Sequence, residues 1–326
     1  DQVSYLNNNG QQLRLINPAD IEAAAVGDPM LSGVGSTLSE RRTRIDNFAA
    51  QNAADPIYFN KDESRAFGVF LKSATPAQAL IFLEGLKNGF GDKASVVLGQ
   101  IDNGEGNFWA DAGAVYQASG NNKFFVDVFN GKKFVDEKGD AQPNAADKET
   151  RTAITSSLTS IMGGGDLTAR MQNVANFAYT SRLAGGAVED EDGSLWRRTL
   201  QEAMGATYKD DERLLGGVFD MDGQNVILDP SMSIVDAEYV EDNVNRMSAE
   251  TLAALVGEDA AGRVSKTDLA NIGFVGTNRA NQVFLTNAMG ARIGARPVYL
   301  TELRNVLQRQ GVTRMTLGEI GGYGGR

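Results

Sequence analysis

Residues 75–101 read TPAQALIFLEGLKNGFGDKASVVLGQI and predict two helices joined by a tight turn. Thr75 is a good N-cap residue, and Pro76 after it fits the first turn of a helix. Leucines recur at helical spacing up to Gly89, where we expect the first helix to end, and Asp92 is the expected cap of the second. The short connection predicts an antiparallel helical hairpin. None of these residues is typical of a catalyst.

Caps and apolar stripes predict further helices on both sides of this hairpin. Thr37 and Glu40 form a capping box, and Asp62, Ser194 and Thr301 are expected N-caps. The stretches expected to be helical are 17–29, 37–56, 62–73, 107–119, 148–165, 166–186, 194–205, 232–247, 248–257 and 300–311. We expect the helices of 148–165 and 166–186 to pack as a pair.

The segment 122–137 has two readings. Asn130 and Gly131 stand between two apolar runs and are a strong signal for a β-hairpin, since both residues tolerate positive φ. The apolar residues before them also fit one face of a helix: Phe124, Phe125, Val128 and Phe129. The residues alone leave the choice between hairpin and helix open.

The C-terminal third predicts some β-structure. Apolar runs flank Asp222-Gly223 and predict a β-hairpin over 216–230, and 281–290 and 296–300 are strand-like. We therefore expect a mainly α protein of antiparallel helical hairpins or bundles, with a small C-terminal part that contains a β-hairpin. The expected segments are a polar arm with a short helix (1–36), a helical domain (37–140), a second helical pair (141–205), an α+β part (206–317) and a glycine-rich tail (318–326).

Composition narrows the possible chemistry. The 326 residues include no Cys and no His, and the net charge is −11. Thiol nucleophiles, disulfides, thiolate metal sites and His-dependent hydrolases are thereby excluded. No cofactor is expected, and no run of apolar residues is long enough for a transmembrane helix.

The charge is unevenly distributed. Residues 187–260 hold 18 acidic and 5 basic residues, whereas basic residues gather at 41–44 and in 292–326. An acidic surface usually serves solubility, but the stretch 189–259 is also a candidate surface for a basic partner. Binding to nucleic acid needs a dominant positive face, so no such partner is expected.

Glu63 is the one catalytic candidate. It is followed by Ser64, and lytic transglycosylases of the lysozyme type place a Glu-Ser pair in the helical wall of a cleft. The further segments that those families need are missing here. A Glu in the first turn of a helix is more often explained by the helix dipole. We therefore predict no enzymatic activity, with cleavage of peptidoglycan through Glu63 as the alternative.

Other candidate sites have simpler explanations. Asp220, Asp222 and Asn225 place oxygen ligands on one tight turn, as Ca²⁺ requires, but an EF-hand loop would continue differently. The glycines of 162–166 precede a helix and offer N–H groups to an anion, without the Lys-Ser/Thr of a P-loop. Arginines placed for phosphate contacts are Arg279, Arg292 and Arg296. Trp109 and Trp196 fall on apolar helical faces and are expected in the core.

The order of three short patterns resembles the large internal virion proteins, or ejection proteins, of short-tailed bacteriophages. The patterns are Phe90-Gly91-Asp92 between two helices, the hairpin from Gly216-Gly217-Val218 to Leu228-Asp229-Pro230, and the helical stretch 248–255. The resemblance covers about residues 65–285. It implies a non-enzymatic region of a chain that often carries a lytic transglycosylase domain elsewhere, and it favours the helical reading of 122–137.

The resemblance also implies partners and a location. Other virion proteins or copies of the same chain are the expected partners, and the virion, followed by the host envelope during infection, is the expected location. The first residue, Asp1, is not an initiator Met, which agrees with a segment of a longer polypeptide. Another virion component, such as a portal-proximal, scaffold or tail protein, is a further alternative.

Overall fold

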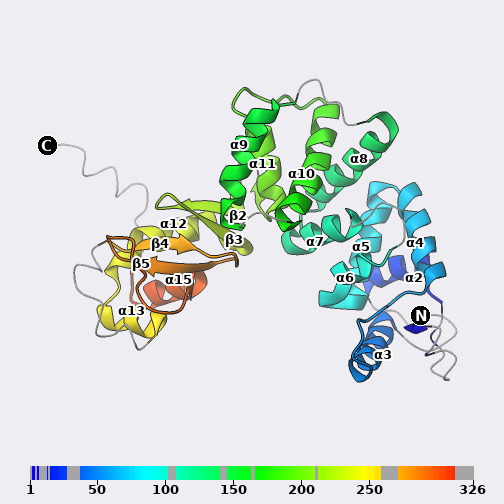
Figure 1. Ribbon diagram of the computed structural model, residues 1–326, viewed down its shortest axis with the longest axis horizontal. Helices are drawn as coiled ribbons and strands as arrows, with labels where there is room; N and C mark the ends of the chain where they lie inside the picture. The colour runs from blue at the N-terminus through cyan, green and yellow to red at the C-terminus, as the bar shows by residue number, and fades with distance from the viewer. Residues whose placement is uncertain are drawn as a thin grey trace. The chain divides into compact units, whose positions relative to one another are not determined.

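The computed structural model describes residues 2–3, 6, 13, 15–27, 37–101, 108–139, 145–162, 166–209, 212–257 and 271–312. As predicted, the described part is mainly helical with a small β part, which consists of two antiparallel sheets of three strands each (Figure 1). Contacts divide the chain into two compact units. The first comprises Asp1–Ala145 and Arg170–Asp190, and the second comprises Ala146–Ala169 and Glu191–Arg326. The finer division into five segments stays a prediction, and its tail at 318–326 lies outside the described residues.

The first unit is built from helices. They are α2 (Pro18–Ala23), the 3-10 turn η1 (Ala24–Val26), α3 (Leu38–Gln51), α4 (Lys61–Ser73), α5 (Pro76–Phe90), the 3-10 turn η2 (Gly91–Lys93), α6 (Ala94–Leu98), α7 (Phe108–Ser119), α8 (Asn122–Lys138) and most of α10 (Asp166–Ala184). Helix α5 is central, since it contacts α2, α3, α6 and α8. The stretch 75–101 therefore supplies the helix around which this unit packs.

The predicted N-cap of α5 is confirmed: Thr75 accepts from the backbone N–H of Gln78, and the Gln78 side chain accepts from Thr75 in return.

Glycines let neighbouring helices approach α5 closely. A Cβ atom at Gly85 would lie 1.7 Å from the carbonyl oxygen of Ile21, and one at Gly89 would lie 2.5 Å from the Cβ of Leu38. The prediction that Gly89 ends the helix is wrong, because this glycine makes room for Leu38 inside it.

The turn after α5 also differs from the expectation. Helix α5 ends at Phe90, and Gly91 follows with φ 56°, a conformation that favours glycine. The predicted cap at Asp92 is wrong, because Asp92 lies within η2 and the short helix α6 has no side-chain cap. Arg42 of α3 instead holds this turn: it donates to the carbonyl oxygen of Phe90 at 2.7 Å and lies 3.5 Å from the Asp92 carboxylate.

Residues 122–138 form a helix, so the hairpin alternative is wrong. The four apolar residues that suggested a helical face are all buried. Gly131 is buried too, and a Cβ atom there would lie 1.7 Å from the carbonyl oxygen of Phe177 in α10. Asn130, its neighbour, is exposed. The glycine that resembled a turn residue is instead the point where two helix backbones meet.

Three further predicted caps are wrong. Helix α4 is capped by Asn60 rather than Asp62, because Asn60 and Glu63 form the capping box. Gly193, in a left-handed conformation, precedes α11 (Ser194–Ala203), and Ser194 is already helical. Tyr299 precedes α15 (Leu300–Arg309) without a side-chain cap, so Thr301 lies inside the helix.

The second unit combines helices with both sheets. Besides α11 and α15, its elements are α9 (Lys148–Thr159), the 3-10 turns η3 (Ser160–Met162) and η4 (Val244–Arg246), β1 (Thr207–Lys209), β2 (Glu212–Met221), β3 (Gln224–Ser233), α12 (Ile234–Asn243), α13 (Ala249–Val256), β4 (Gly273–Gly276), β5 (Gln282–Thr286) and β6 (Val298–Tyr299). The expected pairing of 148–165 with 166–186 stays a prediction. Helix α9 packs on α11, where Trp196 donates to the carbonyl oxygen of Arg151 at 3.3 Å and to Thr155 Oγ1 at 3.2 Å.

One apolar core joins the sheets to the C-terminal helices. Strand order is β1-β2-β3 in one sheet and β4-β5-β6 in the other, and all pairs are antiparallel. Figure 1 shows α12, α13 and α15 gathered around β4 and β5. Fully buried side chains from all of these layers meet in one cluster, among them Met221, Val226, Val240, Val256 and Leu303. The predicted hairpin is confirmed as β2–β3, whereas β1 and β4 were not expected.

The turn between β2 and β3 allows the cost of backbone strain to be measured without any steric clash. Asp222 and Gly223 have φ values of 52° and 75°, as a two-residue hairpin turn requires. A Cβ atom at Gly223 would meet nothing within 4 Å. Gly223→Ala is therefore expected to lower the free energy of unfolding by about 1–2 kcal/mol through conformational strain alone. Urea denaturation checks this, with the exposed neighbour Gln224→Ala as control; equal stability of the two variants would contradict it.

Candidate functional site

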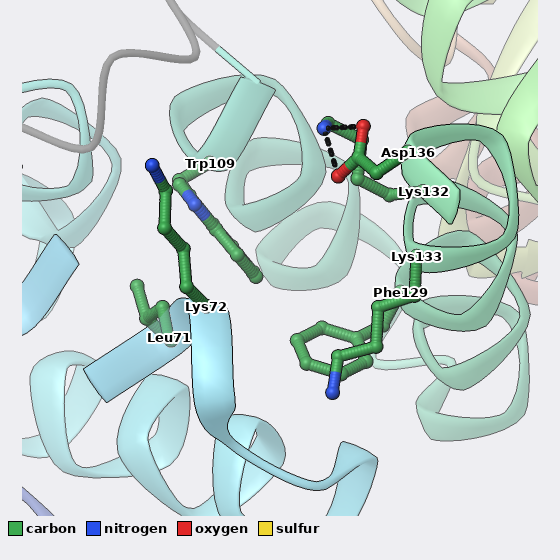
Figure 2. Close-up of a pocket in the computed structure, with 7 residues that line it drawn as sticks. All are labelled: Leu71, Lys72, Trp109, Phe129, Lys132, Lys133 and Asp136. Carbon is green, nitrogen blue, oxygen red and sulfur yellow. Dashed lines mark hydrogen bonds and ion pairs between the residues drawn. The ribbon is translucent and has the colours of Figure 1, made fainter. Parts of the chain in front are cut away.

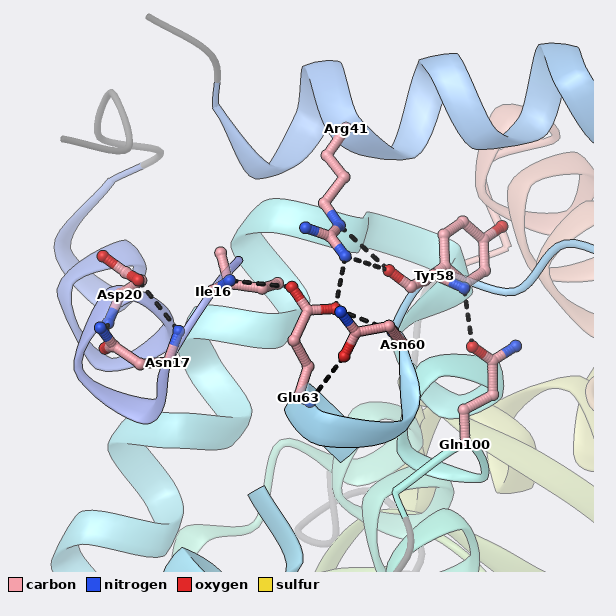
Figure 3. Close-up of polar contacts among 8 residues, drawn as sticks. All are labelled: Ile16, Asn17, Asp20, Arg41, Tyr58, Asn60, Glu63 and Gln100. Atoms are coloured by element: carbon pink, nitrogen blue, oxygen red, sulfur yellow. Dashed lines mark hydrogen bonds and ion pairs between the residues drawn. The ribbon is translucent and has the colours of Figure 1, made fainter. Parts of the chain in front are cut away.

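Glu63 lies at the centre of a buried polar cluster in the first unit (Figure 3). The residue is 3% exposed. One carboxylate oxygen, Oε1, accepts from the backbone N–H of Ile16 at 2.9 Å. The other, Oε2, accepts from the backbone N–H of Asn60 at 2.8 Å and pairs with Arg41 Nη2 at 2.6 Å. Both oxygens are thus held by protein donors from three separate segments.

Arg41 is buried just as completely. It is 1% exposed, and its Nε and Nη2 donate to the carbonyl oxygen of Tyr58 at 3.0 and 2.9 Å. Burial lowers the pKa of the Arg41 guanidinium, and the adjacent Glu63 carboxylate opposes that shift. Gln100 extends the network by accepting from the Tyr58 backbone N–H at 2.9 Å. The arrangement fixes the start of α4 against α3 and the chain before α2.

This geometry suits a structural carboxylate. A general acid must reach the atom that it protonates within hydrogen-bonding distance. The oxygens of Glu63 face Ile16, Asn60 and Arg41, and Ser64, which follows it, donates to the carbonyl oxygen of Gln100 at 2.6 Å. The Glu-Ser pair that suggested a lytic enzyme therefore binds other parts of the same unit.

The residues of the candidate Ca²⁺ turn make hydrogen bonds within the hairpin and to α12 and α9. Asp220 Oδ1 accepts from the Gly223 N–H at 2.8 Å, and the Asp222 N–H donates to Glu241 at 2.7 Å. Asn225 turns its amide nitrogen to the carbonyl oxygen of Ser157 at 2.6 Å. Within the described ranges, no cluster of three or more acidic side chains is arranged to hold a metal ion.

The carboxylates near this turn still influence one another. Burial is the main cause that raises the pKa of Glu241, and the neighbouring charges of Asp222, Asp242 and Asp220 add to it, while the hydrogen bond from the Asp222 N–H opposes it. The structure therefore brings four acidic groups from β2, its turn and α12 near each other. Asn225, the third proposed ligand, instead contacts the chain at the end of α9.

Two of the arginines proposed for phosphate contacts pack against groups of the second unit. Arg292 lies over the ring of Phe284 at 3.9 Å, and Arg296 donates to the carbonyl oxygens of Leu255 and Ala254 at 3.0 Å each. Arg41 is buried with Glu63, as described above. In the glycine-rich candidate 162–166, residues 163–165 lie outside the described part of the chain.

Both tryptophans are buried, as expected, at 4% exposure each. Sequence reasoning nevertheless missed one feature: Trp109 lines a small cavity with lysines from α4 and α8 (Figure 2). Lys72, Lys132 and Lys133 come from helices whose mutual contact is not visible from sequence spacing. In the sequence, Trp109 is an aromatic residue on an apolar helical face, which predicts burial but does not reveal a cavity.

A buried tyrosine gives a prediction about alkaline pH. Burial is the main cause, and the adjacent Glu84 the second, that raise the pKa of Tyr116 to about 12; its hydroxyl donates to Glu84 at 3.1 Å. The unfolded value is about 10. The stability from this raised pKa is therefore complete below about pH 10 and is lost as the pH rises through 12. We expect Tyr116→Phe to flatten the loss of stability over this range in urea denaturation.

The control for that prediction is Tyr299→Phe, since the Tyr299 side chain is 46% exposed. It should leave the pH dependence of stability as in the unmodified chain. The same slope in Tyr116→Phe and in the unmodified chain would contradict the assignment.

Comparison with known proteins does not identify this chain. No family model, no curated protein and no solved structure matches it. Across the described residues, no helix combines the length and the apolar character needed to cross a membrane.

Proposed function

We propose that this chain is a structural and interaction segment of a phage virion protein, specifically an internal ejection protein that assists genome delivery across the host envelope. Its partners would be other virion proteins or further copies of itself. In this proposal the chain contributes helical packing surfaces rather than a reacting side chain. Its location would be the phage particle, and then the host envelope during infection.

The local structure of three stretches, 90–92, 216–230 and 248–255, supports the proposal, since the resemblance rests on them. Residues 90–92 connect α5 to the short apolar helix α6. Residues 216–230 lie in the β2–β3 hairpin, and the stretch 248–255 is α13 with Ser248 as its N-cap. These are the elements that the resemblance implies at each place and in that order.

The packing of the first unit agrees with a scaffolding role. Close approach at Gly85, Gly89 and Gly131 makes helix contacts depend on small residues. The strongest catalytic candidate, Glu63, is occupied by backbone and side-chain donors. Both features are typical of a chain in which side chains were selected for contact between elements.

Mass spectrometry of purified phage particles tests this function. Particles of a phage that encodes this chain should contain its peptides at a fixed copy number per virion, and the peptides should be lost from particles after genome ejection. Retention after ejection would place the chain in a portal-proximal or tail structure, and abundance in assembling proheads alone would make it a scaffold. Either result would overturn the ejection role.

A further inference from the structure

A polar groove in the second unit is lined by the start of strand β4 and by the β2–β3 turn. Residues 271–275 line it together with Asp222 and Gln224, with Asn245 of η4 and with the chain at the end of β5. Its volume is about 470 Å³, within the range of about 300–1,000 Å³ that ligand sites usually occupy. Because Asp222, Gln224, Asn245 and Asn271 are all exposed, a ligand can reach them from solvent.

Side-chain amides make up most of the polar lining, and the backbone holds two of them in place. The Oδ1 atom of Asn245 accepts from the N–H of Ile272 at 2.8 Å. The Oδ1 atom of Asn287 accepts from the N–H groups of Met289 and Ala291 at 3.0 Å each. Both amide oxygens are thus occupied, and neither amide nitrogen bonds to another residue that the structure describes. Each of these side chains therefore has a fixed NH₂ donor left for a ligand.

Asp222 supplies an acceptor in the same groove. It is exposed, and its carboxylate makes no hydrogen bond or ion pair within the described part of the chain. Its backbone is held by the turn, where the Asp222 N–H donates to Glu241 at 2.7 Å. Burial, and then the negative charges of the nearby Asp residues, raise the pKa of Glu241. The electrostatic field around this carboxylate is therefore negative, which disfavours an anion as the ligand.

A sugar hydroxyl matches this set of groups, because one hydroxyl both donates and accepts hydrogen bonds. It can donate to the carboxylate of Asp222 while its oxygen accepts from an amide NH₂ group. A cation would find the acceptor but would be repelled by the fixed donors. A bound peptide draws most of its affinity from apolar or aromatic anchors in pockets, whereas the apolar residues Ile272 and Phe274 of the lining are only 3% and 2% exposed. The lining therefore favours an uncharged ligand that is rich in hydroxyl groups.

We propose that this groove binds a neutral oligosaccharide, whose neighbouring hydroxyl groups donate to Asp222 and accept from the side-chain amides of Asn245 and Asn287. An exposed site without an apolar wall binds weakly, so we expect dissociation constants in the millimolar range. The site does not rest on the proposed virion role, since all of its residues belong to the second unit.

Nuclear magnetic resonance of the side-chain amides tests the proposal on the full chain. The ¹⁵N-labelled protein is titrated separately with maltotriose, with cellotriose and with the trimer of N-acetylglucosamine. At least one of them should shift the NH₂ signals of Asn245 and Asn287 along a saturating curve. Glycerol, which has hydroxyl groups but no sugar ring, should give no saturating shift. The NH₂ signal of Asn130, exposed in the first unit, should not move.

A pair of variants separates this site from general effects of charge. Asn245→Asp removes the amide donor but keeps the local fold, because the new carboxylate still accepts from the N–H of Ile272. It should weaken saccharide binding roughly two- to tenfold, as the loss of one hydrogen bond implies. Asn305→Asp makes the same change at an exposed position of α15 that does not line the groove, and it should leave the binding curve unchanged.

Three outcomes would overturn the proposal. The first is that none of the saccharides shifts the Asn245 and Asn287 signals, or that glycerol shifts them equally. The second is an equal loss of binding in Asn245→Asp and Asn305→Asp, which would be an effect of charge at a distance. The third is that these signals move with the concentration of the chain itself, or with a lysine-rich peptide, and with no saccharide; the groove would then be a surface for docking protein.

Discussion

Glu63→Gln is expected to lower the free energy of unfolding of the first unit by about 3–5 kcal/mol, the largest effect of any single change considered for this chain. The substitution keeps the size of the side chain but removes its charge. It leaves the Arg41 guanidinium, 1% exposed, without the carboxylate that pairs with it at 2.6 Å. An uncompensated buried charge is far more costly than the pair itself is favourable.

The control for this substitution is Asp62→Asn, one residue earlier in the same first turn of α4. Asp62 is exposed, and loss of its charge should cost only about 0.3–1 kcal/mol through the helix dipole. Urea denaturation followed by circular dichroism measures both variants. A similar small loss in both would mean that Glu63 is not needed to compensate Arg41.

Gly131→Ala is expected to have the second largest effect, a loss of about 1–3 kcal/mol or more from overpacking. In an exposed helix the same change would add about 1 kcal/mol of stability, because alanine favours helix more than glycine does. Here the new Cβ would lie 1.7 Å from the carbonyl oxygen of Phe177, so α8 and α10 would have to move apart. The sign of the effect therefore distinguishes the helix contact from a simple propensity effect.

Asn130→Ala is the matched control for Gly131→Ala. Asn130 is exposed on the same helix, so alanine there should raise stability by up to about 0.7 kcal/mol. Thermal unfolding of both variants gives the comparison. A stabilising Gly131→Ala would show that this close approach is absent, and a destabilising Asn130→Ala would favour the hairpin that the dipeptide also suggests.

Much of the secondary structure could be predicted from caps and periodicity. Thr37 and Thr75 form the capping boxes that their local sequence indicates, because such caps need only residues three positions apart. The N-cap of α4 was predicted wrongly because Asp62 and Asn60, which lie two positions apart, are both good cap residues. Glu63 decides between them, since its carboxylate accepts from the Asn60 N–H.

Features that depend on distant residues could not be predicted. Asn130-Gly131 is a turn signal in isolation, and only the backbone of α10, some 46 positions later, makes the glycine a helix contact. The pairing of α9 with α11 likewise passes over α10, most of which belongs to the other unit. Periodicity shows which face of a helix is apolar but does not name its neighbour.

The surroundings of the candidate site residues could not be predicted either, because they too depend on distant parts of the chain. The sequence singles out Glu63 by its type and its neighbour Ser64, but its burial with Arg41 arises from contacts between α3 and α4. The cavity at Trp109 could not be found, since Lys72 and Lys132 are 60 positions apart in sequence. Chemistry-bearing residue types are visible in a sequence, whereas the donors that surround them are not.

Clearing of a peptidoglycan suspension measures whether Glu63 serves the packing of the first unit or a reaction. Wild-type chain, Asp62→Asn and Glu63→Gln are compared, each shown to be folded by circular dichroism. We expect that none of the three lowers the turbidity below that of buffer. Equal clearing by wild type and Asp62→Asn, abolished in a folded Glu63→Gln, would contradict it.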